Sequence, residues 1–500
     1  MLDWRKSNLT AEIKKNDIYP VDIVDISDEG LGIGHINGMT VFVKDTAIGD
    51  VAEVRVVKVK KNLCFGRLEK LITPSGYREE PVCPVSRQCG GCTLQHITYE
   101  KELEIKKNRV LGCLQRIGKI ENPEQYLDDI HGMTEVSLGY AGSKNDSDKN
   151  QTPYLRYRNK MQFPVGSDNN GKTVTGFYAG RTHFIIPIDD CVIGHEVNRF
   201  ITRAICKWAD DKGVSVYDEE SGKGIIRHIL TRIGFSTGQL MVTLVINSSD
   251  IPDQNGFISI LKSSVADYNK EKNDNLNLTS VALNINKKNT NKIMGDKTKY
   301  IYGNEYIEDY IGDVKFRISA ASFYQVNPVQ TKLLYDKALE YAALTGKEKV
   351  WDMYCGIGTI SLFLAKKAKK VFGVEIVPQA IENAVENAEL NGIDNTEFFV
   401  GKAEDVVTGL YDQSLLTGKK DYRADVVVVD PPRKGCDEKL LETLVKMAPE
   451  RLVYVSCNPA TLARDIKILT DFGFSLSKFS IHDQFPRGMN IETVCLMTRA

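Results

Sequence analysis

The chain has 500 residues, of which 42% are hydrophobic and 26% are charged, so it is too long for one ordinary domain and too apolar to be wholly disordered. Its 65 Lys and Arg residues balance 66 Asp and Glu residues for a net charge of −1, so any binding of nucleic acid must depend on a local basic surface. The N-terminus lacks the apolar core of a signal peptide, and no run reaches the roughly 18 apolar residues of a membrane span. We therefore expect a cytoplasmic protein whose eleven cysteines are reduced and available as ligands, nucleophiles or core residues.

Residues 11–72 show closely spaced strand patterns separated by glycine turns, which indicate a small β-barrel of the OB type. Within this stretch, residues 51–70 contain six basic side chains and only two acidic ones. Such a surface suits a phosphate backbone, but a charged strand edge is as often simply solvated, and the charges alone do not separate the two. The six basic residues are Arg55, Lys58, Lys60, Lys61, Arg67 and Lys70.

Three cysteines follow in a short segment that contains two glycines, at Cys83, Cys89 and Cys92. A Cys-x-x-Cys pair alone can be a redox dithiol, part of a zinc site or a coincidence, and the additional upstream cysteine argues against a simple dithiol. With a fourth ligand, these thiolates would suit either zinc or an iron–sulfur cluster. The middle of the chain mixes helical and strand-like runs without an internal repeat, which predicts an α+β region, and its polar stretches at 141–153 and 269–279 predict surface insertions.

From about residue 347 the pattern changes to buried-type strands that alternate with helices. This alternation is typical of a mainly parallel, doubly wound α/β sheet. The strands are predicted at residues 350–354, 370–374, 396–400, 424–429 and 451–455. The helices are predicted near residues 360–369, 377–391, 437–448 and 460–471. The predicted fold class is therefore α/β and Rossmann-like, with an N-terminal barrel and an α+β central region.

The first strand of this domain runs into a glycine turn that opens a helix, with the sequence DMYCGIGT over residues 352–359. Its glycines, Gly356 and Gly358, allow the backbone to approach a ligand at the helix N-terminus. The second strand ends at Glu375, a carboxylate that can accept hydrogen bonds from two ribose hydroxyls. Because the full dinucleotide fingerprint is missing, the pattern favours a nucleoside cofactor without a pyrophosphate, such as S-adenosylmethionine. The alternative is a glycine-rich turn in an unrelated α/β domain.

Two later strands end in loops that prolines make rigid. The fourth strand continues into Asp430-Pro-Pro-Arg433, and the fifth continues into Ser-Cys457-Asn-Pro. Open α/β sheets bind ligands beyond the carboxyl ends of their strands, so both loops are expected at the same crevice. A lone cysteine is more often part of a core than catalytic, but this position beside Asp-Pro-Pro-Arg favours Cys457 as a nucleophile.

These motifs, together with Ile-Glu-Thr-Val at residues 491–494, resemble those of the RNA uracil-5-methyltransferases. The resemblance covers nearly the whole chain. The N-terminal barrel resembles a TRAM domain, the cysteine segment resembles the iron–sulfur site of the family, and FYQVN at residues 323–327 is similar to the segment that introduces its methyltransferase domain. In this family the branch with both a TRAM domain and cluster cysteines modifies 23S ribosomal RNA, whereas the tRNA branch is shorter and generally lacks both. The resemblance therefore implies a 23S rRNA enzyme.

For the chemistry, the resemblance implies that Cys457 adds to carbon 6 of a uracil, after which carbon 5 takes the methyl group of S-adenosylmethionine. Glu492 matches the base that removes the carbon 5 proton so that the cysteine can leave. A soft thiolate suits the addition, and a carboxylate is adequate for a proton acidified by the adjacent carbonyl. Asn490 stands where the family often has histidine, a departure that bears on the tuning of Glu492. A uridine in folded RNA must leave its stack to reach Cys457.

The same matching implies the ligand-holding residues. Glu404 and Asp405 are expected near the adenine of the cofactor. The implied iron–sulfur cluster, of the 4Fe–4S type, is expected to be structural or RNA-positioning, because methyl transfer involves no net electron transfer. The cofactor-contacting positions are Gln325, Tyr354, Gly356, Gly358, Glu375 and Asp430, and the cluster ligands are Cys83, Cys89, Cys92 and, as a distant fourth, Cys191.

These inferences divide the chain into an RNA-binding TRAM barrel at 1–72, a central α+β domain with the cluster cysteines at 73–310 and a methyltransferase domain at 311–500. RNA is the partner implied, with no membrane and no obligate protein partner. The alternatives are the same chemistry on a tRNA uridine, methylation of an exocyclic amine of a base, and a non-catalytic RNA-binding or ribosome assembly factor. An exocyclic-amine enzyme would carry an aromatic residue at the position of Arg433 and would need no cysteine nucleophile. Only the cysteine mechanism predicts a covalent adduct with RNA that contains 5-fluorouridine.

Overall fold

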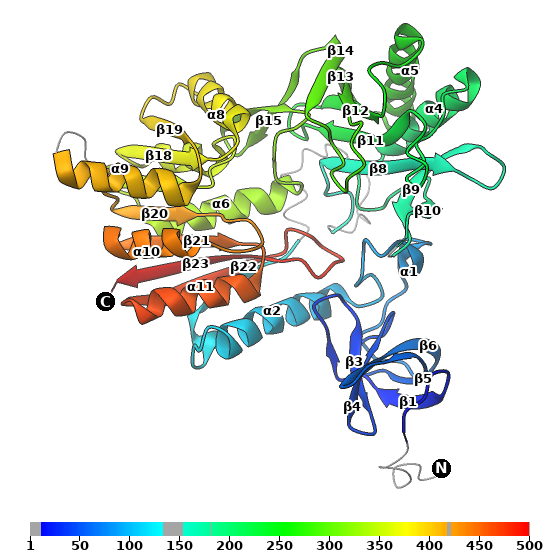
Figure 1. Cartoon of the computed structure of the whole chain (residues 1–500), viewed down its shortest axis with the longest axis horizontal. Coiled ribbons are helices and arrows are strands. Elements are labelled where there is room, and N and C mark those ends of the chain that lie inside the picture. The colour runs from blue at the N-terminus through cyan, green and yellow to red at the C-terminus, as the bar shows by residue number, and fades with distance from the viewer. Residues whose placement is uncertain (1–11, 134–153, 181, 418–421, 500) are drawn as a thin grey trace. The chain divides into compact units, whose positions relative to one another are not determined.

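The computed structural model shows two compact units (Figure 1). The first unit comprises Met1–Arg109 together with Arg487–Met489, and the second comprises Val110–Pro486 together with Asn490–Ala500. The division into three domains at residues 72 and 310 stays a prediction. The residues that the structure describes are 12–133, 154–180, 182–417 and 422–499.

The first unit begins with a six-stranded sheet in the order β1-β5-β6-β4-β3-β2. Along β5 the side chains of Ala52, Val54 and Val56 are buried while their neighbours are less so, which is the period of two that a strand with one core face requires. The short-stranded N-terminal domain expected from the sequence is therefore confirmed. The strands are β1 (Ile18–Asp22), β2 (Asp25–Ile26), β3 (Gly32–Ile36), β4 (Met39–Val43), β5 (Val51–Val59) and β6 (Leu63–Thr73).

The rest of the first unit contains the cysteine segment, with the short helix α1 (Ser86–Cys89), and the first part of helix α2 (Tyr99–Arg116). A buried ion pair stabilises this unit, because Arg78 donates from Nε and Nη2 to the carboxylate of Asp50 at 2.8 and 2.7 Å. The side chain of Asp50 is fully buried and also accepts from backbone amides.

The second unit contains a seven-stranded sheet in the order β10-β9-β8-β11-β12-β13-β14. Helices α4 (Val197–Lys212) and α5 (Gln254–Lys272) pack against it with buried side chains such as Ile201, Trp208 and Phe257. All eight residues of β11 are buried. The strands are β8 (Lys160–Ser167), β9 (Thr173–Tyr178), β10 (Ile185–Pro187), β11 (Ile226–Ile233), β12 (Gln239–Ile246), β13 (Asn277–Ile285) and β14 (Lys297–Gly303).

One of the two predicted surface insertions is corrected by the structure. Residues 269–279 form the last turn of α5, a short connection and the start of β13. The polar residues make this connection tight, because the amide of Asn269 bonds Leu276 through both its oxygen and its nitrogen and Asn273 adopts a positive φ of 51°. The other predicted insertion, at 141–153, lies outside the described residues.

A second sheet of eight strands, in the order β19-β18-β17-β20-β21-β23-β22-β7, carries the C-terminal part of the chain. The strands from β19 to β21 pair in parallel, β23 is antiparallel to both β21 and β22, and β7 is parallel to β22. A hairpin of β15 and β16 precedes this domain. The strands are β7 (Leu127–His131), β15 (Tyr306–Ile311), β16 (Val314–Ser319), β17 (Lys349–Met353), β18 (Lys370–Glu375), β19 (Thr396–Val400), β20 (Val426–Val429), β21 (Arg451–Ser456), β22 (Phe474–His482) and β23 (Glu492–Arg499).

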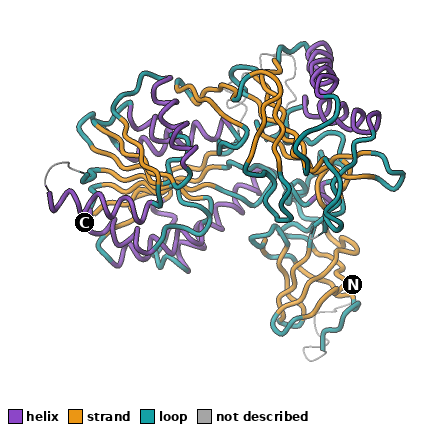
Figure 2. Tube along the Cα trace, turned by 45° about the horizontal axis from the view of Figure 1, so that its top comes forward, coloured by secondary structure: helices purple, strands orange, loops and turns teal. Residues whose placement is uncertain are grey.

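Helices cover both faces of this sheet, and Figure 2 shows its strands running between them. Side chains of α6, α7 and α8 contribute to the core on one face, and side chains of α9, α10, α11 and the end of α2 contribute to the core on the other. The doubly wound α/β fold predicted from the sequence is therefore confirmed. The helices are α6 (Pro328–Ala342), α7 (Thr359–Ala365), α8 (Pro378–Leu390), α9 (Ala403–Thr417), α10 (Glu438–Met447) and α11 (Pro459–Asp471).

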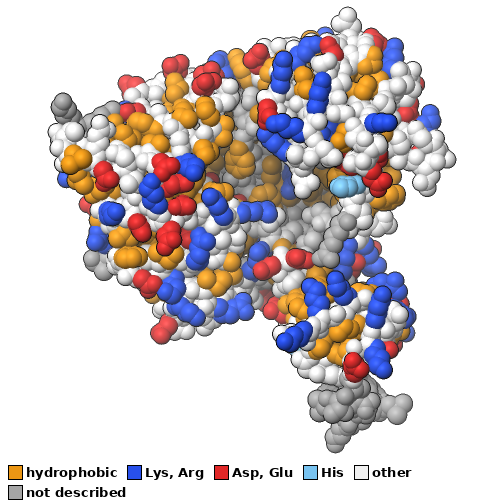
Figure 3. All heavy atoms as spheres, in the orientation of Figure 1, with side chains coloured by type: hydrophobic (Ala, Val, Ile, Leu, Met, Phe, Trp, Pro, Cys, Tyr) orange, Lys and Arg blue, Asp and Glu red, His pale blue; other side chains and the backbone are white. Residues whose placement is uncertain are grey.

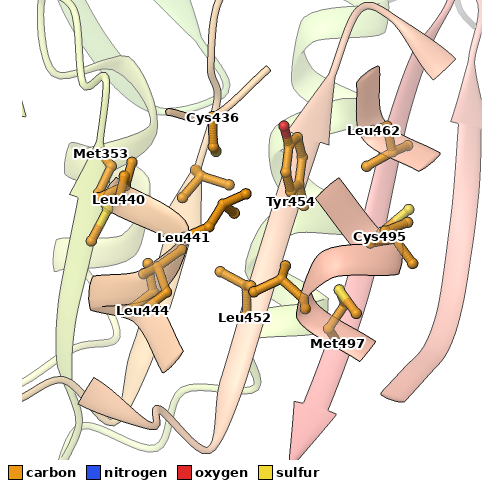
Figure 4. Packing of buried hydrophobic residues seen from close by; sticks show 14 of the residues in the cluster. Met353, Cys436, Leu440, Leu441, Leu444, Leu452, Tyr454, Leu462, Cys495 and Met497 are labelled. Atoms are coloured by element: carbon orange, nitrogen blue, oxygen red, sulfur yellow. The ribbon is translucent and has the colours of Figure 1, made fainter. Parts of the chain in front are cut away.

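Packing around β21 shows why these segments form buried strands. Leu440, Leu441 and Leu444 of α10 lie against Leu452 and Tyr454 of β21 (Figure 4). The neighbouring strand β20 consists of four valines that are all fully buried, as expected for a parallel strand covered on both faces. Among the described helices, none is long and apolar enough to cross a membrane.

The buried histidine of the seven-stranded sheet, His228 on β11, predicts that the second unit loses stability in mild acid. Burial lowers the pKa of His228 to about 4, whereas an unfolded histidine titrates near 6.5. The unfolded chain therefore binds more protons, and the free energy of unfolding falls as the pH drops from about 6.5 towards 4, by up to about 3 kcal/mol for this residue. We expect H228L to flatten this pH dependence, measured by urea unfolding with the fluorescence of the buried Trp208. The matched variant H183L, at an exposed histidine, should leave it unchanged, and equal slopes in both variants would contradict the prediction.

Candidate active site

The predicted site residues of the C-terminal domain meet at one edge of its sheet. Parallel strands β17, β18, β20 and β21 all end at this edge, where open α/β sheets bind ligands. Because β23 is antiparallel to β21, it begins where they end. Ser456 pairs with Thr493 in this register, so the adjoining residues Cys457 and Glu492 lie opposite each other.

The glycine turn after β17 has a backbone conformation that few residues adopt. Tyr354 has φ +70°, and Gly356 and Gly358 have φ +55° and +81°. Positive φ is uncommon for a bulky residue, and such strain persists at places where the surroundings hold it. A Cβ atom added at Gly356 would meet no atom within 4 Å. The outer face of this turn is therefore open to a ligand.

Glu375 at the end of β18 braces the same turn. Its Oε2 accepts a hydrogen bond from the amide of Gly356 at 3.3 Å, and its Oε1 accepts one from the amide of Val377 at 3.0 Å. Each carboxylate oxygen has a second lone pair for a ligand. Ile376 and Val377 are 56% and 50% exposed, so an apolar surface adjoins the carboxylate. This surface was not predicted from the sequence.

Asp352 lies near the end of β17, just before the turn, and the sequence alone indicates no role for it. It is fully buried and accepts a hydrogen bond from the hydroxyl of Ser361 on α7. Burial, with smaller contributions from Asp430 and Glu375, raises the pKa of Asp352 to about 7. Its Oδ1 has no hydrogen-bond partner among the described residues. Asp352 therefore links the end of β17 to α7 and fixes the base of the glycine turn.

The two proline loops are joined by hydrogen bonds. The side-chain amide of Asn458 donates to the carbonyl of Arg433 at 3.0 Å, and the hydroxyl of Thr461 donates to the same carbonyl at 3.2 Å. Asn458 also caps α11, because its Oδ1 accepts from the amide of Ala460. The Cys457 loop is therefore held by its helix and by the Asp430–Arg433 loop.

Electrostatics at this edge favour the neutral forms of its acids. Burial is the main cause that raises the pKa of Cys457 to about 11, Glu492 and Asp430 contribute to the increase, and Arg433 opposes it. Burial also raises the pKa of Asp430 to about 7 and that of Glu492, which is only 4% exposed, well above its usual range. In the free chain at neutral pH, Cys457 is thus a thiol, and burial favours the neutral form of Glu492.

Tyr335 of α6 contributes to the site without any signal in the sequence. It is buried, and its hydroxyl donates to the hydroxyl of Thr359 at the start of α7, at 3.0 Å. Burial raises its pKa, with smaller contributions from Asp430, Asp352 and Glu492. The ring therefore lies among the carboxyl groups of the edge. From its spacing in the helix alone, Tyr335 would be predicted only as a core residue.

Gln325 lies in a buried polar network at the start of α6. Its Oε1 accepts from the side-chain amide of Gln484 at 3.3 Å, and its carbonyl accepts from the side-chain amide of Asn159 at 2.9 Å. Helix α8 bonds both the segment that contains Gln325 and the glycine turn. Asn383 donates to the hydroxyl of Ser322, and Asn387 donates to the carbonyl of Ile357 in the glycine turn. The Gln325 segment and the glycine turn are thus held by one helix.

Glu404 and Asp405 lie in the first turn of α9. Asp405 pairs with Lys439 of α10 at 2.6 Å. Glu404 is close enough to Tyr354 to raise the pKa of that phenol, after the larger effects of burial and of Cys436. Of the two, Glu404 is therefore the one that faces the glycine turn.

The cysteine segment brings thiols together in the first unit. Cys83 is buried, and Cys89 and Cys92 are half-buried. Burial raises the pKa of Cys89, and Cys83 raises it further, so these two thiols are within electrostatic reach. Three thiols on one short segment fit the donor set of a thiolate-bound metal centre. Within the described ranges, no three His, Cys, Asp or Glu side chains are grouped so as to hold a metal ion, and Cys191 belongs to the second unit.

The basic strands of the first unit are only partly neutralised. Glu69 pairs with Arg55 and Arg67 at 2.8 and 2.6 Å. Lys58 on β5 and Lys60 just after that strand are exposed, and Lys60 also lies over the ring of Phe65. Figure 3 shows Lys and Arg side chains gathered over these strands.

Comparisons with known proteins identify the class. A family model described as tRNA (uracil-5-)-methyltransferase matches residues 257–500, and the TRAM domain model matches residues 14–68. A protein of Bacillus cereus named an uncharacterized RNA methyltransferase is 45% identical over 99% of both chains. One of the same name from Clostridium acetobutylicum is 43% identical over 97% of this chain and 98% of its own. Fold, site and relatives together define an S-adenosylmethionine-dependent RNA methyltransferase.

A solved structure from Pyrococcus abyssi covers almost the whole chain. It is described as tRNA (uracil-54, C5)-methyltransferase in complex with S-adenosyl-L-homocysteine, and it is 26% identical with a TM-score of 0.72 over 96% of this chain and 99% of its own. The chain belongs to the RNA (uracil-5-)-methyltransferase family. This match corrects the expectation that tRNA enzymes of the family are shorter, since a protein named for tRNA is similar over almost the full length of this chain. Overall architecture therefore does not separate rRNA enzymes from tRNA enzymes.

The charges around Cys457 predict how its reactivity depends on pH. Alkylation by iodoacetamide requires the thiolate, so the rate in the free protein should rise up to about pH 11. We expect D430N to move this midpoint to lower pH, because it removes a carboxylate that disfavours the thiolate. R433M should move the midpoint to higher pH, because it removes the cation that favours the thiolate. Mass spectrometry of the peptide that contains Cys457 measures both rates, and unchanged midpoints would contradict the electrostatic account.

Proposed function

We propose that this protein methylates carbon 5 of a uridine in RNA through a covalent bond between Cys457 and carbon 6 of the uracil. The observation that carries the proposal is the position of Cys457 opposite Glu492 across the β21–β23 pair, at the edge where the glycine turn and Asp430 also lie. S-adenosylmethionine, when bound, supplies the methyl group on a positively charged sulfur. The protein residues orient the uracil, activate it and return it to aromaticity.

In the proposed first step, the thiolate of Cys457 bonds to carbon 6, and the electron pair of the 5,6 double bond moves into an enolate that makes carbon 5 nucleophilic. Carbon 5 would then take the methyl group, whose bond to the sulfonium sulfur would break with the electron pair left on that sulfur. Because burial and two carboxyl groups keep Cys457 protonated in the free chain, the thiolate is expected to form only when substrate and cofactor fill the edge. Arg433 is the nearby cation that favours it.

In the proposed last step, Glu492 takes the proton from carbon 5, the double bond re-forms and the sulfur of Cys457 leaves carbon 6. Burial makes Glu492 a stronger base than an exposed carboxylate. Asn490, in the place of the usual histidine, is exposed, while Ile491 between them is fully buried.

The proposed cofactor site follows the glycine turn. Glu375 would hold the ribose, the open backbone at Gly356 would lie against the cofactor, and Tyr354 would be kept in its strained conformation to face it. Gly358 would shape the turn, since a side chain there would meet Ala384 and Phe398. Gln325 and Asp430 are the proposed contacts from the neighbouring loops. The exposed Ile376 beside Glu375 offers an apolar surface for the adenine ring, alongside Glu404.

We expect E492Q to stop after methyl transfer, because the amide keeps the shape of the carboxylate but cannot accept the carbon 5 proton. Methylated RNA should then remain attached to Cys457 and migrate slowly on a denaturing gel, whereas the wild type should show little of this species. The double variant with C457A should show none, and C457A alone should lose methylation while it still binds S-adenosylmethionine. Release of methylated RNA by E492Q at a near wild-type rate would assign the base to another group.

For the RNA, we propose 23S rRNA, on the resemblance of the TRAM domain and cysteine segment to that branch of the family, and a cytoplasmic location with it. The Pyrococcus abyssi protein is the reason to keep tRNA as the second candidate. Mapping 5-methyluridine in both RNAs from a strain that lacks this protein decides between them. Complementation with C457A should fail to restore the missing modification. If no 5-methyluridine disappears from either RNA, or if 5-fluorouridine RNA forms no adduct, the non-catalytic RNA-binding factor replaces this proposal.

We further propose an iron–sulfur cluster held by Cys83, Cys89, Cys92 and Cys191, in a structural or RNA-positioning role. Protein purified without oxygen should contain iron and sulfide and absorb broadly in the visible range. Serine at any of the four positions should lower the iron content, whereas C206S, at a half-buried cysteine of α4, should not. Stoichiometric zinc without visible absorbance would favour a Cys₄ zinc site, and a normal cluster in C191S would require another fourth ligand.

A further inference from the structure

A three-residue segment of the C-terminal loop is part of the first unit. Arg487–Met489 belongs to the first unit, although Pro486 and Asn490 on either side belong to the second. In the sequence, only Asn490 and Ile491 separate this segment from Glu492. Asn490 is exposed and Ile491 is fully buried, and these two residues join the segment to the strand that begins at Glu492.

Arg487 holds the segment through charged and backbone partners, and its own side chain is 2% exposed. Its Nη1 donates to Glu102 at 3.3 Å and to the carbonyl of Ile97 at 3.2 Å. Its Nη2 donates to Glu79 and to the carbonyl of Gln95 at 3.2 Å. Its backbone amide donates to Glu102 at 2.7 Å. The guanidinium is thus bonded on both of its terminal nitrogens inside the unit.

The rest of the segment is anchored as well. Met489 packs in an apolar cluster that includes Ala47, Leu94 and Ile105. Its carbonyl accepts from the guanidinium of Arg109 at 2.7 Å. Glu102 is fully buried and also bonds the fully buried Lys106 at 2.7 Å, so removal of Arg487 would leave a buried carboxylate with one cation fewer.

The partners that hold Arg487–Met489 in the first unit, among them Glu79, Glu102 and Arg109, form a socket for this segment. The cysteine segment forms one wall of this socket. The amide of Leu94 donates to the carbonyl of Arg487 at 3.1 Å. The side chain of Gln95, whose backbone carbonyl Arg487 bonds, accepts from the amide of Cys83 at 3.1 Å. Leu94 follows Cys92 by two residues. The backbone that carries the cysteines therefore bonds directly to the segment that leads to Glu492.

We propose that Arg487 is a positioning residue for Glu492: its socket in the first unit fixes where the strand of Glu492 begins, and so controls removal of the carbon 5 proton. This inference rests on the proposed function, because it assumes Glu492 as the base. It assigns the first unit a part in the last chemical step besides any contact with RNA. Loosening the socket should slow elimination more than methyl transfer, because Cys457 is held by Asn458 and the Arg433 carbonyl in the second unit.

The test compares R487M with R78M, E492Q and the wild type as full-length proteins. R78M removes a half-buried arginine of the first unit, whose side chain bonds Asp50 and the carbonyl of Asp45 and not the 487–489 segment. For each protein, single-turnover methyl transfer, RNA affinity and the fraction of methylated RNA still bound covalently to Cys457 are measured. We expect R487M to accumulate the methylated adduct at least tenfold above wild type, with methyl transfer and RNA affinity changed less than threefold, and R78M to accumulate none.

The outcomes separate this inference from the function on which it rests. If E492Q traps the adduct but R487M does not, or if R78M and R487M behave alike, the positioning role is wrong and the proposed function stands. If E492Q traps no adduct, both fall together. M489A weakens the apolar side of the same socket and leaves no buried charge unpaired. If R487M does not fold, adduct accumulation is measured in M489A instead. Adduct accumulation in M489A supports the role, and its absence overturns it.

Discussion

The antiparallel pairing of β23 with β21 is the constraint on which the proposed chemistry of this protein depends. All pairings from β19 to β21 are parallel, so those strands offer the edge only the loops that follow them. An antiparallel neighbour adds the beginning of a strand, and this places Glu492 opposite Cys457. A register slip of one residue would turn Glu492 to the other face, and Val494 and Cys495, fully buried in the cores on opposite faces, hold the register.

Burial is the second determinant, because it decides the charge state of the groups that this pairing brings together. It is the largest cause of the raised pKa values of Cys457, Asp430, Asp352 and Glu492. Burial thus favours the neutral forms of these acids and of the thiol, in a medium of low polarity where any new charge is felt strongly. The arrival of charged ligands can therefore change protonation states here more than at an exposed cluster of the same residues.

Much of the fold was predictable from the sequence, since parallel strands covered on both faces are continuous apolar runs, as in Val426–Val429. Helix α9 was not predicted; its sequence contains Gly409 at mid-length, a residue that weakens helical patterns. The segment 269–279 was mistaken for an insertion because side-chain bonding by Asn269, and not apolar spacing, defines its turn.

The site was predictable in part and for a different reason. Strand ends and proline loops placed Cys457, Asp430 and Glu375 at one edge, and the structure brings them there with Glu492, whose place the resemblance supplied. The surroundings were not predictable: the hydroxyl contact of Tyr335 with Thr359 and the bonds of Arg487 with Glu102 join residues far apart in the chain. No periodicity or spacing records such pairs.

The positive φ of Tyr354 has a consequence for the evolution of this enzyme. A tyrosine in this conformation costs of order 1 kcal/mol relative to glycine, and the packing of its ring against the core on one face of the sheet offsets that cost. In the proposed function the same ring also faces the cofactor, so packing and ligand contact depend on one side chain. The turn is therefore expected to tolerate substitution poorly as the sequence diverges, because a smaller side chain would relax the backbone but lose the packing.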